Sequence, residues 1–285
     1  MPSFPIIDSH LHIWRPDLID ISWLNSAGKL NRGFTLQDFD EASAAVEVEA
    51  MVFVECDVDE TATLAEARWV ADVARQDHRI RAIVAQAPIH KGDAVRGHLE
   101  KLRDIALMRG VRRLLQQEAD ADFALRPDFI DGLKALSEFG WSFDICITYR
   151  QMESTIKLVR RFPEMRFVLD HIGKPGIREH RFQPWADQMK ELARSGNVVC
   201  KLSGVATEAE HAHWTVSDIE PFMTTALEAF GTKRLMFAGD WPVATNAVSY
   251  VGWVQAVDEV MSKLSGSELR ALYRDNAIET YKLNV

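Results

Sequence analysis

The stretch IIDSHLHIW, from Ile6 to Trp14, begins as an apolar run typical of a buried strand and then carries two histidines two positions apart. Successive side chains of a strand point to opposite faces, so His10 and His12 are predicted to project to the same side. Two imidazoles on one face can bind a metal ion or polarise a carbonyl group. So short a motif also occurs at ordinary polar strand ends, and its meaning therefore depends on the rest of the chain.

Short apolar runs like this one recur along the chain and alternate with helix-length amphipathic stretches. The predicted strands are 6–12, 50–56, 80–89, 110–115, 142–147, 166–173, 198–204 and 235–242. The predicted helices include 60–76, 128–140, 152–163 and 265–283. About eight strand–helix units over 285 residues predict the α/β class and, within it, a (β/α)8 TIM barrel. No linker, repeat or shift in composition divides the chain, so residues 1–285 are predicted to form a single domain, with 15–31 as a loop over one barrel face.

The composition narrows the classes of function. With 47% hydrophobic and 26% charged residues the chain can bury a large core, and its net charge of −9 without a basic stripe argues against a nucleic-acid partner. No run of roughly 18 uncharged apolar residues occurs, so no membrane partner is expected and a cytoplasmic location is predicted. Cys56, Cys146 and Cys200 lie in apolar strand-like segments and not in Cys-x-x-Cys pairs, so buried reduced thiols are predicted.

In a (β/α)8 barrel the active site forms where the strands end, so polar residues at the predicted strand ends are candidate site residues. These residues are His10, His12, Glu55, Gln86, Arg112, Arg113, Asp144, Tyr149, His171, Lys201, Ser203, Asp240 and Trp241. Arg112 and Arg113 alternate in direction, so at most one of them is expected to enter the barrel. The pattern combines a His-x-His on the first strand with a histidine on the sixth and an aspartate on the last. Such a combination is better explained by a common site than by polar residues that occur at strand ends by chance.

These residues resemble the amidohydrolase superfamily, and within it the TIM-barrel lactonase branch that includes L-fuconolactonases, L-rhamnonolactonases and 2-pyrone-4,6-dicarboxylate lactonases. The resemblance spans nearly the whole chain and rests on IDSHLHIW, FVECD, GVRRLLQ, LDHIGKP, KLSG, FAGDWPV and NAIETYKL. It implies that His10, His12, His171 and Asp240 are the catalytic residues, and that the same four would ligate a metal if one is bound. L-fuconolactonases are the nearest match, which implies an L-fucono-lactone or similar aldonolactone substrate and a role in sugar breakdown.

The resemblance also bears on the cofactor. Binuclear members carry a bridging Lys or Glu at the fourth strand and a His at the fifth, whereas GVRRLL and SFDICI offer arginines and no histidine. A binuclear site is therefore not expected, and the enzyme is predicted either to need no cofactor or to hold one Zn²⁺. A single Zn²⁺ would lower the pKa of a bound water to about 7.

The expected mechanism uses Asp240 as the general base that accepts a proton from water while the hydroxide adds to the lactone carbonyl. No Gly-x-Ser-x-Gly elbow is present, which fits a reaction without a covalent nucleophile. Candidate substrate contacts are Glu55, Arg112, Trp14 and Trp241. Glu55 could instead be a buried acid paired with a cation, and each tryptophan could equally be a core anchor.

Three functions stay open on the sequence: a sugar-lactone hydrolase, a metal-dependent decarboxylase of a small carboxylate, and a barrel that only binds a sugar or a partner protein. Sensitivity to a chelator and release of CO₂ would distinguish the decarboxylase, because a lactonase releases one acid equivalent per turnover. A mere binder has no evident use for Asp240 and three histidines. The expected partner is a small-molecule sugar lactone, and the sequence is compatible with a homodimer.

Overall fold

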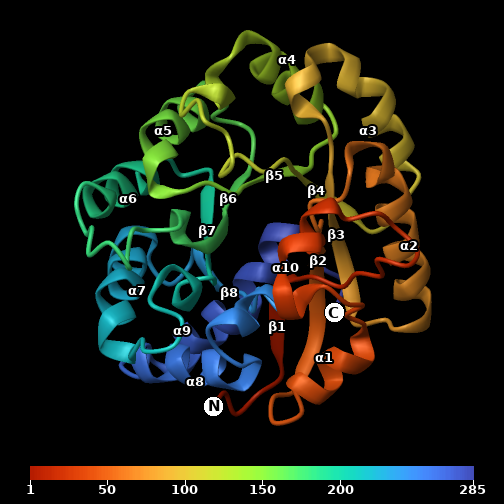
Figure 1. Ribbon diagram of the computed structural model, residues 1–285. Helices are drawn as coiled ribbons and strands as arrows, with labels where there is room; N and C mark the ends of the chain where they lie inside the picture. Colours follow the sequence, from red (N-terminus) through yellow and green to blue (C-terminus); the bar gives the residue numbers. More distant parts are fainter.

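A computed structural model describes residues 1–285 and contains one sheet of eight parallel strands in the order β1 to β8 (Figure 1). The strands are β1 Ile6–Leu11, β2 Val48–Val54, β3 Ile80–Gln86, β4 Met108–Arg112, β5 Ser142–Ile145, β6 Phe167–Leu169, β7 Val198–Leu202 and β8 Leu235–Phe237. The helices are α1 Leu36–Ala42, α2 Thr63–Gln76, α3 Arg96–Arg103, α4 Pro127–Ser137, α5 Met152–Arg161, α6 Trp185–Ala193, α7 Val216–Phe230, α8 Tyr250–Val260, α9 Gly266–Arg270 and α10 Asn276–Tyr281. The predicted (β/α)8 barrel is confirmed.

The barrel closes between β1 and the segment that follows β8. Leu11 forms a parallel bridge with Trp241, and the backbone N–H of His12 donates to the Trp241 carbonyl at 2.8 Å. The N–H of Asp240 donates to the His10 carbonyl at the same distance, 2.8 Å. Residues at opposite ends of the chain are thereby joined at the edge of the barrel where the site was expected.

All eight strands end earlier than predicted, and β6 and β8 fall short by the most. β6 stops at Leu169 and β8 at Phe237, because the backbone turns into left-handed conformations just beyond them. His171 has φ 53° and Asp240 has φ 52°, values that a continued strand does not allow. The two predicted site residues thus lie on sharp turns directly above their strands and not within them.

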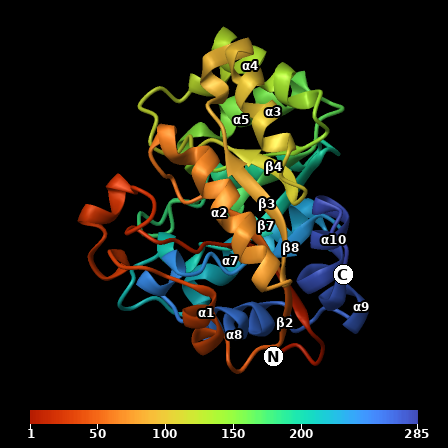
Figure 2. The same cartoon turned by 90° about the vertical axis from the view of Figure 1, so that its right-hand side faces the viewer.

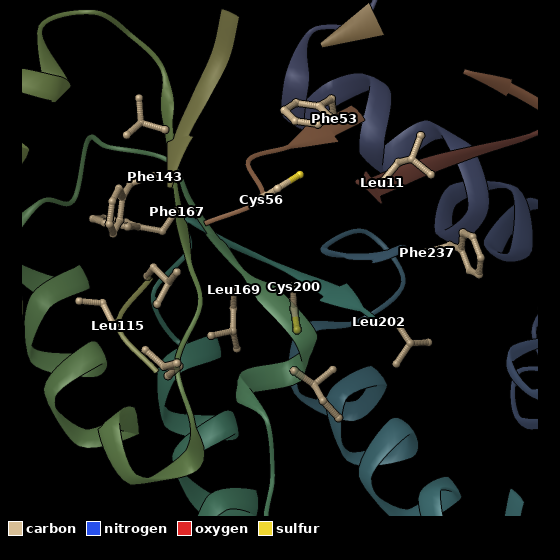
Figure 3. Packing of buried hydrophobic residues seen from close by; sticks show 14 of the residues in the cluster. Leu11, Phe53, Cys56, Leu115, Phe143, Phe167, Leu169, Cys200, Leu202 and Phe237 are labelled. Atoms are coloured by element: carbon tan, nitrogen blue, oxygen red, sulfur yellow. The ribbon is translucent and has the colours of Figure 1, made fainter. Parts of the chain in front are cut away.

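Apolar side chains fill the layer between the sheet and the surrounding helices. Figure 2 shows these strands and helices in a view turned by 90° from Figure 1. In this layer the ring of Phe143 on β5 lies between Phe129 of α4 and Phe167 of β6, at centroid distances of 5.9 and 6.4 Å, and Figure 3 shows the latter pair. Cys56, Cys146 and Cys200 are buried and free, as predicted. None of the helices has both the length and the apolar character that a membrane crossing requires.

A second, smaller apolar cluster fills the lower part of the barrel interior. It joins Ile7 of β1 and Val52 of β2 to Tyr281 and Leu283, which belong to α10 and the residues after it. α10 lies against the barrel interior in Figure 1. This apolar packing closes the N-terminal end of the barrel, opposite the strand ends at which the site was expected.

Candidate active site

His10 and His12 project from β1 to the same side, as the strand period predicted. Their Nε2 atoms lie 3.1 Å apart, and Asp240 Oδ1 lies 3.7 Å from the first and 3.4 Å from the second. His12 Nδ1 lies 2.8 Å from the Val54 carbonyl, which can only accept, so Nδ1 carries the proton and Nε2 keeps a free lone pair. A backbone carbonyl on the far ring nitrogen is the usual way that a metal-binding histidine is oriented.

His10 is completely buried, and its Nδ1 lies 3.3 Å from Asp170 Oδ1 and 3.3 Å from the Lys201 ammonium. Burial lowers the pKa of His10 well below its usual value, so the ring is neutral. A proton on Nδ1, facing Asp170, leaves the Nε2 lone pair directed at His12. Arg112 Nη1 lies 3.3 Å from this Nε2 atom, and the Nε2 atoms of His10 and His12 face each other and Asp240 Oδ1 at distances of 3.1 to 3.7 Å. This donor set fits a single divalent metal ion.

His171, on the turn that follows β6, completes the group. Its Nδ1 lies 2.9 Å from the Ser203 hydroxyl and 4.0 Å from Asp240 Oδ2, and its ring centroid is 4.7 Å from that of His10. A Cβ on Gly204 would come within 2.9 Å of the His171 ring, so only glycine allows this approach. Burial lowers the pKa of His171 to about 4, and the ring is therefore neutral at pH 7.

Asp240 is the carboxylate shared by all three histidines. Burial by itself would raise the pKa of Asp240, but the imidazoles of His171, His12 and His10 outweigh it and hold this pKa below its usual range. The carboxylate is therefore ionised and able to accept a proton or to bind a metal ion. The structure brings together the four residues that the sequence predicted, although they are separated by up to 230 positions.

A chain of buried ion pairs supports the histidines from below. Lys201 Nζ lies 2.7 Å from Asp144 and 3.0 Å from Asp170, and Arg112 Nη1 lies 3.1 Å from Asp170. Arg112 also bonds Glu55 through Nε at 2.5 Å. His10, Asp170 and His171 form a second group with metal-ligand spacing, but the two cations already neutralise Asp170. One divalent ion is therefore what the site accommodates.

A cavity of about 180 Å³ opens above these residues. Its walls are His12, Trp14, Trp23, Cys56, Asp57, Arg112, Leu114, Gln116, Gln117, Cys146, His171, Lys174, Asp240 and Val243. Of the four candidate substrate contacts, Arg112 and Trp14 line this cavity. Glu55 does not, because it is fully buried and holds Arg112 in place. Trp241 does not either, because its ring packs on Phe34 and Phe39.

The loop expected over one face of the barrel forms part of this cavity. Trp23 donates its indole N–H to the Cys56 carbonyl at 2.8 Å, and Lys29 donates to the Thr245 carbonyl at 2.6 Å. These two bonds tie the loop to the residues that follow β2 and β8. Of the arginine pair, Arg112 enters the barrel, whereas Arg113 pairs with Glu118 outside it.

Several residues of the site were missed in the sequence. Asp170 precedes His171 in the motif LDHIGKP, and its place between two cations and His10 follows only from the folded barrel. Gln116 and Gln117 follow directly on a predicted strand, and this position was the available signal. Cys56 and Cys146 were predicted only to pack, yet both also reach the cavity wall.

Glu66 of α2 lies behind this wall and yields a prediction about stability. Its Oε1 accepts the Cys56 N–H at 2.9 Å, and burial, followed by the charge of Glu55, raises the pKa of Glu66 from 4.5 to about 8. Between these values the unfolded chain loses a proton that the folded chain keeps, so stability falls as pH rises. Glu66→Gln keeps the acceptor and cannot ionise. At each pH the free energy of unfolding of Glu66→Gln is compared with that of the wild type. This difference should increase in favour of the variant by about 3 kcal/mol from pH 5 to pH 8.

Urea unfolding at the two pH values measures this difference. The exposed Glu228 of α7 provides the control, and Glu228→Gln should show no such growth. If the free energy of unfolding of Glu66→Gln differed from that of the wild type by the same amount at both pH values, the Glu66 carboxyl would be ionised in the folded protein.

The geometry can be compared with known proteins. A family model described as amidohydrolase matches residues 7–283. The chain belongs to the amidohydrolase family. This membership confirms the resemblance seen in the sequence, and it establishes the chain as an enzyme of a hydrolase family.

This amidohydrolase is similar to two proteins named L-fucono-1,5-lactonase. The one from Burkholderia multivorans is 33% identical, with 97% of this chain and 96% of that protein covered, and the one from Burkholderia ambifaria is 30% identical, with 98% and 96% covered. A crystal structure of a Burkholderia multivorans amidohydrolase with bound zinc superimposes with a TM-score of 0.88 at 31% identity, covering 99% of this chain and all of that one. Sugar-lactone hydrolysis is thus supported in general, and decarboxylation is the less supported alternative.

Proposed function

We propose that this amidohydrolase opens an aldonolactone, with an L-fucono-lactone as the first candidate, to the corresponding aldonic acid. The observation that carries the proposal is Asp240, whose ionised carboxylate lies 3.4 Å from His12 Nε2 on the wall of the cavity. A carboxylate base beside imidazoles is suited to activating water against an ester carbonyl. The names of the relatives from Burkholderia support the same reaction class.

The lining of the cavity supports a neutral, hydroxylated substrate. Trp14 and Trp23 form an edge-to-face pair with centroids 5.7 Å apart, and an indole packs well against the apolar face of a sugar ring. Gln116 and Gln117 offer amides to hydroxyl groups. The guanidinium of Arg112 already faces two carboxylates, so it has little charge left for an anionic substrate.

In this mechanism Asp240 takes a proton from water, and the resulting hydroxide adds to the lactone carbonyl carbon. Ser203 Oγ lies 2.9 Å from His171 Nδ1, and with the hydroxyl as the hydrogen-bond donor there, the Nε2–H of His171 is free to donate to the developing oxyanion. The tetrahedral intermediate then collapses with cleavage of the bond to the ring oxygen, and protonated Asp240 returns its proton to that oxygen. His10, His12 and Asp240 would hold a divalent ion, which as a Lewis acid would polarise the carbonyl.

The test is acid release in weak buffer with a pH indicator. L-fucono-, L-galactono-, D-arabinono- and L-rhamnono-lactones are each assayed before and after chelation, with the metal content of the protein measured in parallel. We expect one acid equivalent per turnover for at least one lactone. Loss of turnover on chelation with recovery on added Zn²⁺ would make the ion part of the enzyme, whereas unchanged turnover would leave the reaction to the protein residues. No acid release with Zn²⁺ or Mn²⁺ present, together with CO₂ release from a small carboxylate, would overturn the proposal.

A further inference from the structure

The turn that follows β6 is left-handed over four successive residues. The φ angles from His171 to Lys174 are 53°, 46°, 73° and 44°, and the Lys174 N–H donates to the His171 carbonyl at 2.9 Å. Left-handed residues other than glycine are sterically costly, most of all a β-branched residue such as Ile172. Backbone strain of this kind persists only where the surrounding structure fixes it, and it is concentrated at functional sites.

The position of His171 does not by itself require so long a turn. Asp240 reaches the same cavity from the end of β8 with a single left-handed residue, itself, at φ 52°. The three left-handed residues after His171 bring a second side chain of the same turn, that of Lys174, to the cavity wall. The Tyr149 N–H donates to the Lys174 carbonyl at 3.1 Å and holds the end of the turn. The strain of this turn therefore serves Lys174 as well as His171.

Lys174 is the one cation on the cavity wall whose charge has no close partner. Arg112, the other cation there, is held by two carboxylates, whereas Lys174 Nζ lies 3.9 Å from Glu208 Oε1, which is beyond hydrogen-bond distance. This Nζ forms no hydrogen bond and yet is not sealed from solvent. Burial alone would lower the pKa of Lys174, but its neighbours, with Cys146 and Glu208 first, outweigh it and raise this pKa. Lys174 therefore offers charged, unused N–H donors.

The surroundings of Lys174 place its ammonium beside the reacting atoms. Its charge interacts with Cys146 and Asp240, and both of these residues belong to the wall of the same cavity. The cavity holds only about 180 Å³, so a lactone whose carbonyl carbon lies above Asp240 has the next ring atoms within reach of Lys174. In an aldonolactone the carbon next to the carbonyl carries the 2-hydroxyl group, whose oxygen can accept from an ammonium. A substrate carboxylate at this place would be repelled by Asp240.

We propose that Lys174 binds the 2-hydroxyl group of the substrate, so that the enzyme selects lactones with a hydroxyl group next to the carbonyl. The inference rests on the proposed function and makes its substrate class more specific. The ammonium donates to the hydroxyl oxygen, and this hydrogen bond holds the ring with its carbonyl carbon above Asp240. A 2-deoxy lactone lacks the acceptor and leaves the ammonium without a partner. L-fucono-lactone carries the 2-hydroxyl group and stays the first candidate.

The experiment compares two lactones that differ only in this hydroxyl group. They are L-fucono-1,5-lactone, or whichever lactone releases acid in the assay above, and its 2-deoxy analogue. Lys174→Met keeps the length of the side chain and removes its N–H donors. In this variant we expect the ratio of kcat/KM for the 2-hydroxy to the 2-deoxy lactone to fall at least about tenfold from its wild-type value, the effect of one lost hydrogen bond to a charged group. The intrinsic reactivities of the two lactones cancel in this comparison.

A matched control separates this effect from the general loss of a lysine. Lys190 of α6 is exposed and lies outside the cavity, so Lys190→Met should leave both kcat/KM values unchanged. The ratio does not depend on the fraction of enzyme that is folded, and Lys174→Gln, as a second variant, should shift it in the same direction. A ratio unchanged in both Lys174 variants, even with both rates lowered, would overturn the contact with the 2-hydroxyl group, while lactone hydrolysis by the wild type would still stand.

The two proposals can fail separately. If the wild type hydrolyses no lactone, calorimetry with L-fucono-1,5-lactam and its 2-deoxy analogue gives the answer, because it measures binding without turnover. Tighter binding of the 2-hydroxy lactam that is lost in Lys174→Met would keep the contact at Lys174 and reject the lactonase. Equal binding of the two lactams in that case, or binding of neither, would overturn the contact.

Discussion

Asp240→Asn is expected to lower kcat for lactone hydrolysis by about 100- to 10,000-fold, the usual contribution of a general base. The amide has nearly the shape of the carboxylate but cannot take a proton from water or return it to the ring oxygen. Because Asp240 Oδ1 lies within 3.7 Å of both His10 and His12, the affinity for Zn²⁺ should fall as well. Initial rates of acid release and calorimetric Zn²⁺ titration measure the two effects separately.

The control for this variant is Asp187→Asn, which changes an exposed aspartate in the first turn of α6. It should keep wild-type rates. Both variants should keep the wild-type circular dichroism, so a loss of activity cannot be ascribed to unfolding. Near-normal turnover in Asp240→Asn would remove this carboxylate from the mechanism and require another base.

Lys201→Met is expected to cost about 3–5 kcal/mol of unfolding free energy, the range found when one partner of a buried ion pair is removed. Burial alone would lower the pKa of Lys201, but Asp144 and Asp170 outweigh it and raise this pKa, so the side chain is charged. It lies 2.7 and 3.0 Å from the two carboxylates and is completely buried. Removal of its charge leaves Asp144 without a cation, whereas Asp170 keeps Arg112. Urea unfolding monitored by tryptophan fluorescence gives the free energy.

Replacement of the Asp144 carboxylate, which Lys201→Met leaves without a cation, by a neutral amide should recover part of the lost unfolding free energy. In the double variant Lys201→Met with Asp144→Asn, the hydroxyl of Tyr281, now 2.6 Å from Asp144 Oδ2, can still donate to the amide oxygen. We therefore expect the double variant to be more stable than Lys201→Met, even if the single variant fails to fold. The exposed Lys190→Met is the control and should cost little. A loss below about 1 kcal/mol in Lys201→Met would show that the buried charges do not depend on one another.

The alternation of strands and helices could be predicted because each element carries its own local pattern of apolar residues. The ends of β6 and β8 could not, since LDHIG and FAGDW are apolar enough to continue as strands. Left-handed residues at His171 and Asp240 end the strands instead, and these conformations are held by contacts from other strands. For Asp240 such a contact is the bond from its N–H to the His10 carbonyl, at 2.8 Å.

The histidines and Asp240 could be predicted as site residues because the C-terminal end of every barrel strand faces the same side of the fold. The assignment of Glu55 and Trp241 to the cavity wall had no such basis. The position of a residue at a strand end predicts where it lies along the barrel axis. It does not predict whether its side chain lines a cavity or contacts a buried partner. Glu55 meets Arg112, and Trp241 meets two phenylalanines, and both partners come from distant segments.

The sequence by itself therefore determined the barrel, the face on which the site lies and the residue types available for its chemistry, because these depend on periods of two and 3.6 residues and on strand order. Only the tertiary structure decided which charges are neutralised and which polar atoms stay free. Asp170 is held between Lys201 and Arg112, whereas Gln86 Oε1 and His90 Nδ1 are buried without a hydrogen-bond partner. Such pairings depend on distances of a few ångströms between segments far apart in the chain, and barrel closure and side-chain packing set those distances.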